Sequence, residues 1–144
     1  MDIALLLANF GLMALAFLLA VPTAWDRERR ERSAGLRTYP LVAIASCAYT
    51  LIGQSVFHES PEAQARILEG LITGIGFIGG GAILKMNDHV HGTATAASIW
   101  STGALGAAVG FQRFEIAILL SVINFAVLRW LNAFKENSRI DEPV

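Results

Sequence analysis

Five long runs of apolar residues, separated by short polar segments, set the strongest limit on what this chain can fold into. A helix rises about 1.5 Å per residue, so runs of this length suit a hydrocarbon core of about 30 Å. Backbone groups in lipid must bond within their own segment, which favours helices. We therefore predict an all-α polytopic membrane bundle of about five transmembrane helices, over residues 3–25, 41–57, 68–84, 94–111 and 116–134.

The composition also indicates that lipid surrounds the chain. Of the 144 residues, 54% are hydrophobic and 16% are charged, whereas a typical soluble domain is about 25% charged. The mean hydropathy is +0.52. A lipid bilayer is therefore the expected surrounding of a single domain over residues 1–144, and the net charge of −1 gives no indication of a nucleic acid partner.

Lysine and arginine residues gather on one side of the predicted membrane. Counting alternate connections places nine of the 11 on one side and two, Arg66 and Arg113, on the other. Basic residues are enriched in cytoplasmic loops. We therefore expect the N-terminus outside and the C-terminus in the cytoplasm, as an odd number of spans requires.

The third run contains the stretch TGIGFIGGGAIL, in which Gly74, Gly76 and Gly79 have the GxGxxG spacing of a dinucleotide-binding turn. Such a turn needs a strand before it, a helix after it and an acid about 20 residues further on. The nearby acid after Gly79 is Asp88, which is too close, and no βαβ pattern surrounds the stretch. The sequence therefore disfavours a phosphate-binding loop.

Small residues recur at helical spacings in the third and fourth runs. In lipid, small side chains let two helices approach closely. We predict that these helices pack against each other as a hairpin, through Gly70, Gly74, Gly76, Gly79, Gly81, Ala97, Ser101 and Ala104. An alternative stays open, in which the glycines at 79–81 break the third helix and expose carbonyl oxygens to a polar cavity.

The acid most able to carry function is Asp26, which lies beside Arg27 where the first run meets the basic segment WDRERRERSAGLRT. In one interpretation, this segment is solvated and its charges stop translocation of the chain across the membrane. In another, Asp26 faces the bundle and either pairs with Arg37 or, as a weak candidate metal ligand, holds Mg²⁺. No catalytic triad can be assembled from the serine, histidine and cysteine positions, so we expect neither an enzyme nor a cofactor.

Three stretches, ERSAGLRTYPLVA, ARILEGLITGIGFIGGGAIL and VHGTATAASIWSTGALGAAVG, resemble the membrane domain of the MgtC/SapB family in order and spacing. The match covers about residues 26–110. Asp26 stands where the family has glutamate, and His91 where it usually has arginine. By position, the resemblance implies a polar cluster of Asp26, Arg27, Arg37, Thr38, Arg66 and Thr95.

The resemblance implies a bacterial inner-membrane protein, multi-pass, linked to magnesium homeostasis, stress or acid tolerance. Its best-known members also carry a cytoplasmic ACT-like domain, which we do not expect here because the sequence ends at Val144. Two modes of action stay open. One is binding to another membrane protein, such as F-type ATP synthase, or to further copies in a homo-oligomer. The other is a Mg²⁺ or proton transporter or channel subunit, for which one chain offers few carboxylates.

Overall fold

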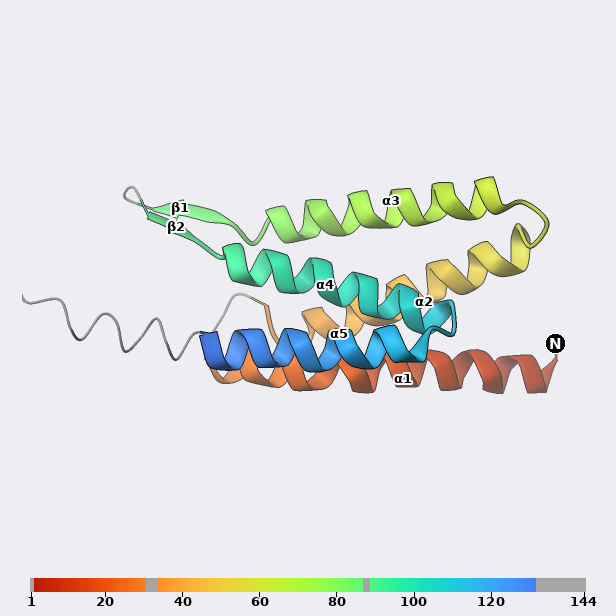
Figure 1. The fold of residues 1–144 in the computed structure, drawn as a ribbon, viewed down its shortest axis with the longest axis horizontal. Helices are drawn as coiled ribbons and strands as arrows, with labels where there is room; N and C mark the ends of the chain where they lie inside the picture. Colours follow the sequence, from red (N-terminus) through yellow and green to blue (C-terminus); the bar gives the residue numbers. More distant parts are fainter. Residues whose placement is uncertain (1, 31–33, 87–88, 132–144) are drawn as a thin grey trace, which may run out of the picture.

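The computed structural model describes residues 2–30, 34–86 and 89–131, which form five helices and one small hairpin (Figure 1). The helices are α1 (Ile3–Arg29), α2 (Thr38–Val56), α3 (Pro61–Gly80), α4 (Thr93–Gly110) and α5 (Phe114–Ala126). A π-helix, η1 (Val127–Leu131), continues α5, and the strands β1 (Leu84–Met86) and β2 (His89–His91) pair antiparallel between α3 and α4. The all-α prediction is confirmed for the bundle, to which the structure adds the hairpin.

The chain crosses the length of the bundle repeatedly, so its connections fall at two ends. One end holds the start of α1 and the α2–α3 and α4–α5 connections (Figure 1). The other holds the end of α1, the β1–β2 hairpin and η1, and is hereafter the hairpin end. Two of the described helices, α1 and α2, are long and apolar enough to cross a membrane by length and composition.

Capping residues shift the predicted helix boundaries. α3 begins at Pro61 rather than at residue 68, because the Ser60 hydroxyl accepts a hydrogen bond from Ala63 N at 3.3 Å and proline suits the first helical turn. α1 begins after Asp2, whose Oδ1 accepts from Ala4 N at 2.9 Å. Each of the five predicted runs nevertheless corresponds to one helix.

α4 lies at the centre of the bundle and packs against α1, α2, α3 and α5. Its close contact with α2 depends on glycine. A Cβ at Gly106 would overlap the Ala43 carbonyl oxygen, and one at Gly110 would lie 2.7 Å from Thr50 Cβ. Small residues thus bring two backbones together, as lipid-embedded helices require.

α3 and α4 do pack against each other, as predicted, but several residues of the predicted face make no close contact. The residues concerned are Gly70, Gly74 and Gly76, where an added Cβ would meet no atom within 4 Å, and Ala97 and Ala104, which are exposed. The physical reason is that α4 turns its other side, which carries Gly103, Gly106 and Gly110, into the bundle. Spacing identified a helix able to approach closely but not the side that does so.

The remaining residues of that face lie nearer to α4 or to the end of α3. A Cβ at Gly79 would lie 3.0 Å from the Ala96 carbonyl oxygen, so Gly79 does allow α3 to approach α4. Ser101 is half-buried. At Gly81 the near atoms belong to α3 itself, the closest being Ile78 O at 3.3 Å.

The glycines at 79–81 end α3 instead of interrupting a longer helix, so α3 stops at Gly80 and residue 84 lies in a strand. Three carbonyl groups at this end accept hydrogen bonds from the following turn: Phe77 O from Gly81 N, Gly79 O from Ala82 N, and Gly80 O from Ile83 N. These carbonyls are therefore not bare groups lining a polar cavity. Gly74 and Gly76 lie inside α3, which excludes a strand-to-helix phosphate turn.

The hairpin returns to α4 through Gly92. This residue has φ 89°, a left-handed conformation that favours glycine, and an added Cβ would overlap the Ala82 carbonyl oxygen. The backbone at Gly92 therefore brings the start of α4 beside the end of α3.

Candidate functional site

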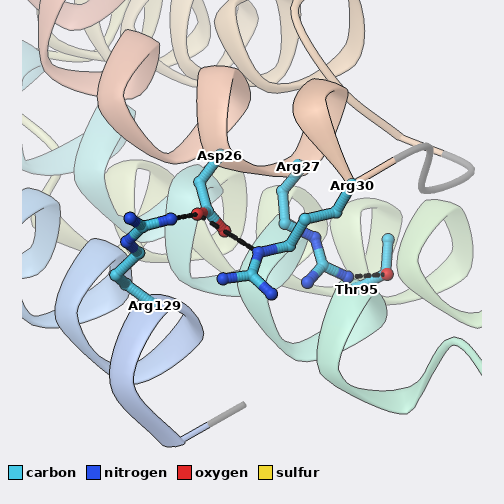
Figure 2. Close-up of polar contacts among 5 residues, drawn as sticks. All are labelled: Asp26, Arg27, Arg30, Thr95 and Arg129. Atoms are coloured by element: carbon cyan, nitrogen blue, oxygen red, sulfur yellow. Dashed lines mark hydrogen bonds and ion pairs between the residues drawn. The ribbon is translucent and has the colours of Figure 1, made fainter. Parts of the chain in front are cut away.

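Asp26 lies at the hairpin end and is paired with two arginines from different helices (Figure 2). Its side chain is 4% exposed. Arg30, the residue that follows α1, places Nε 3.3 Å from the carboxylate, and Arg129 of η1 places Nη1 3.6 Å from Oδ1. A carboxylate buried this deeply is costly without such partners, and here they also connect α1 to η1.

Arg27 points into the bundle beside Asp26 and is 3% exposed. Its Nη2 donates a hydrogen bond of 2.5 Å to the Thr95 hydroxyl, which is itself buried near the start of α4 (Figure 2). The guanidinium also interacts with the hydroxyl of Tyr39 on α2. Three helices that are distant in sequence therefore meet at this side chain.

A chain of buried polar groups continues from Thr95 along α4. Ser98 Oγ donates to Thr95 O at 2.9 Å and lies 2.5 Å from the Tyr39 hydroxyl. Thr102 Oγ1 donates to Ser98 O at 2.8 Å, and Asn124 Nδ2 of α5 lies 3.5 Å from the Thr102 hydroxyl. Because each hydroxyl has a partner inside the protein, this interior chain holds α2, α4 and α5 in register.

The arginine–aspartate cluster, defined as Asp26, Arg27, Arg30, Thr95 and Arg129, carries one carboxylate and three guanidinium groups. A hard cation such as Mg²⁺ prefers several oxygen ligands, whereas here the carboxylate is bordered by positive charge. The described residues contain no group of three or more His, Cys, Asp or Glu side chains able to hold a metal ion. The residues therefore do not fit a Mg²⁺ site at Asp26.

The structure brings together part of the polar cluster that the sequence indicated. Asp26, Arg27 and Thr95 lie side by side at the hairpin end, as Figure 2 shows. Arg37 is exposed, and the described ion pairs of Asp26 are with Arg30 and Arg129 instead. Thr38, which is half-buried, starts α2 and its backbone N donates to Gly35 O at 3.0 Å.

Arg66 does not belong to this cluster. It lies near the start of α3, at the opposite end of the bundle from Asp26, and its side chain is exposed. Its place in the predicted set came from motif position alone, although the count of basic residues already placed Arg66 on the opposite side of the membrane. The structure therefore separates Arg66 from Asp26 and Arg27.

Sequence reasoning missed Arg129 as a partner of Asp26, and Tyr39 and Ser98 as partners of Arg27 and Thr95. One signal was available for Arg129. An arginine inside an apolar run is costly without a partner, so its presence at the end of the fifth run called for a buried acid nearby. Ser98 and Tyr39 had no such signal, because hydroxyls in a span usually bond to their own helix.

Gly35 in the AGLRT segment has a steric role. An added Cβ would overlap the Glu28 carboxylate, which accepts a hydrogen bond of 2.9 Å from Leu36 N. The Glu28 side chain thereby holds the first connection against the end of α1. A side chain at this position would displace the Glu28 carboxylate from this contact.

Comparison with known proteins decides the family. The model of the MgtC family matches residues 13–137, which include the whole arginine–aspartate cluster. The chain belongs to the MgtC family. No solved structure matches the chain.

Relatives in this family come from several bacteria. YhiD of Escherichia coli (strain K12), provisionally described as a magnesium transporter, is 35% identical over 109 residues, which cover 72% of this chain and 51% of YhiD. Uncharacterized protein slr0014 of Synechocystis is 37% identical over 111 residues, covering 77% of this chain and 47% of that protein. Protein MgtC of Salmonella typhimurium (strain LT2) is 34% identical over 108 residues, covering 75% and 46%. The chain spans about half the length of these curated relatives.

Proposed function

We propose that this MgtC-family chain is a multi-pass protein of the bacterial inner membrane that serves magnesium homeostasis by binding another membrane protein. It acts neither as an enzyme nor as an ion pathway of its own. The name of YhiD supports the connection to magnesium. The apolar lengths of α1 and α2 support membrane insertion.

The topology that goes with this function has five spans, with the N-terminus outside and the hairpin end in the cytoplasm. The surplus of basic residues at the hairpin end supports this orientation. The residues concerned, within the described part, are Arg27, Arg29, Arg30, Arg37, Lys85 and Arg129, against Arg66 and Arg113 at the opposite end.

The observation that carries the choice of mechanism is the pairing of Asp26 with Arg30 and Arg129. A cation pathway through the bundle would need carboxylates or carbonyls free to replace water around the ion. The negative charge of Asp26 is already balanced by these two arginines, and the guanidinium of Arg27 lies next to it. An interior of this kind repels Mg²⁺, which favours action through a contact surface.

The surface that supports a partner is the outer side of α3. An added Cβ at Gly70, Gly74 or Gly76 would meet no atom within 4 Å, and Phe77 beside them is 85% exposed. Gly70 and Gly74 border the open groove of about 450 Å³ between α3 and α2. In lipid, such a side lets a second transmembrane helix approach closely. The partner we propose is a helix of another membrane protein, such as a membrane subunit of F-type ATP synthase, or of a second copy.

Cross-linking in living cells tests this proposal. A photo-reactive amino acid at Phe77 should yield a defined cross-linked protein, identified by mass spectrometry, and Gly74→Leu should abolish both the product and growth support in low magnesium. The same amino acid at Leu7, which is 63% exposed on α1, is the matched control. Equal products from both positions, or full growth support by a folded Gly74→Leu protein, would rule out this surface.

A second candidate function is a Mg²⁺ or proton transporter subunit; the description of YhiD names magnesium transport for that relative. The chain of buried groups from Arg27 through Thr95, Ser98 and Thr102 is the observation that favours it. Vesicles containing the purified protein and a Mg²⁺- or proton-sensitive dye test it. An ion flux that exceeds the flux of protein-free vesicles and is lower with Ser98→Ala would show that the protein transports ions. Transport would then take the place of binding as the proposed function.

A further inference from the structure

The last turn of α1 presents two neighbouring arginines, each held by the residue one turn earlier. The Arg29 guanidinium lies over the ring of Trp25, 5.1 Å from its centroid. Arg30 pairs with Asp26 at 3.3 Å. Long side chains lose rotamer freedom when they bind a ligand, so contacts that hold them in advance lower that cost.

Arg129 reaches the same place from the other end of the chain. Its contact with Asp26 engages Nη1, while that of Arg30 engages Nε. A guanidinium has five N–H donors in a planar fork, so both groups keep further donors for a second anion. The side chain of Arg129 is 57% exposed and that of Arg30 is 24% exposed, which leaves both accessible.

Among the residues that the structure describes, acidic side chains do not balance the positive charge at this place. Asp26 supplies one negative charge beside Arg29, Arg30 and Arg129. Glu28, which lies between Asp26 and Arg29 in sequence, accepts a hydrogen bond from Leu36 N instead. The ring of Trp25 is half-exposed, and tryptophan is typical of the depth at which lipid headgroups lie. An anion at headgroup depth would complete the arrangement.

We propose that Arg29, Arg30 and Arg129 form a binding site for the phosphate group of an anionic phospholipid. Forked guanidinium groups match phosphate oxygens, and basic pockets between helices at the cytoplasmic side bind lipid headgroups. The exposed side chains of Trp25, which contacts Arg29, and of Trp130, which follows Arg129 in sequence, favour a lipid over free phosphate, because they offer apolar contact to the acyl chains. The site goes beyond the binding function proposed above and needs no protein partner.

Native mass spectrometry of the purified full chain tests the site, by titration with phosphatidylglycerol and with phosphatidylcholine. Each basic residue near an anionic lipid surface contributes about a fivefold gain in affinity. We therefore expect Arg30→Gln with Arg129→Gln to lower the preference for phosphatidylglycerol by about tenfold or more. The double variant Arg66→Gln with Arg113→Gln makes the same charge change at the opposite end and should keep the preference.

A single variant, Arg29→Gln, guards against a loss of fold, because Arg29 contacts the exposed Trp25 and leaves the pairs of Asp26 intact. It should lower the preference about fivefold with an unchanged unfolding temperature. Equal binding of the two lipids, or an unchanged preference in Arg29→Gln, would overturn the site. Displacement of phosphatidylglycerol by inorganic phosphate alone would assign it to a free anion instead. Neither outcome depends on a partner protein or on growth, so the proposed function is tested separately.

Discussion

At the residue scale, the contact between Arg27 and Thr95 joins a buried charged side chain to a buried hydroxyl. Both side chains are at most 3% exposed, and the hydrogen bond between them joins α1 to α4. A hydrogen bond to a charged group contributes about 1.5–3 kcal/mol, and losing it leaves a buried donor without that partner. A hydroxyl at position 95 is therefore a structural requirement of the cluster.

Replacing Thr95 with valine removes this acceptor while keeping the shape of the side chain. We expect Thr95→Val to lower the free energy of unfolding by about 1–3 kcal/mol, measured by denaturant titration in detergent micelles. Thr95→Ser keeps the hydroxyl and should cost less than about 1 kcal/mol. Equal stability of the valine and serine variants would show that the hydrogen bond contributes little.

Two glycines provide a matched comparison of a close helix contact with an open surface. A Cβ at Gly106 would overlap the Ala43 backbone, so Gly106→Ala should cost about 1–3 kcal/mol because the helices must separate. At Gly74 nothing lies within 4 Å, so Gly74→Ala should be neutral or stabilise by up to about 1 kcal/mol. Thermal unfolding in detergent measures both. A larger loss at Gly74 than at Gly106 would contradict the packing of α4 on α2.

At the element scale, α3 is held to the bundle by few side chains. Its buried residues are Ile75 and Gly79, and the Ile75 side chain occupies the space that a Cβ on Gly103 of α4 would take. Grooves lie on both sides of this contact, one of about 450 Å³ against α2 and one of about 290 Å³ against α4. α3 is therefore the helix best able to shift or to accept a partner.

Shortening Ile75 should weaken this attachment. We expect Ile75→Ala to lower the free energy of unfolding by about 2 kcal/mol, at the low end for a buried isoleucine because lipid tails solvate the separated surfaces equally well. Ile78→Ala, on the half-exposed side of the same helix, is the control and should change stability by less than about 0.5 kcal/mol. If both variants unfold alike, Ile75 does not anchor α3.

The end of α5 shows an element that periodicity could not predict. The fifth apolar run indicated one helix to residue 134, whereas the described chain changes to a π-helix at Val127. A π-turn rotates the residues within it relative to a regular helix, and such turns are frequent at functional sites. Here it carries Arg129, whose guanidinium reaches Asp26.

At the scale of the whole molecule, the orientation of the chain decides on which side of the membrane the arginine–aspartate cluster lies. Cys47 is fully buried, so a newly introduced cysteine is the residue that a membrane-impermeant maleimide would label. We expect Glu59→Cys, in the α2–α3 connection, to be labelled from outside the inner membrane. Arg37→Cys should be labelled only after that membrane is permeabilised, since basic connections stay in the cytoplasm. The reverse pattern would invert the proposed topology.

Prediction from the sequence succeeded for the properties of single helices and only in part for the contacts between helices. Each apolar run gave a helix, and Asp26, Arg27 and Thr95 do lie together. Arg66 was grouped with them although it lies at the other end of the bundle. A position in a motif carries no information about distance between helices.

The sequence by itself determined that the chain is helical, because long apolar segments in lipid must satisfy their backbone groups internally. It also determined which connections are basic. Only the tertiary structure decided that α4 packs on α2 through Gly106 and that Asp26 meets Arg129. Residue spacing defines the sides of a single helix, whereas the partner of each side depends on how all the helices pack around α4.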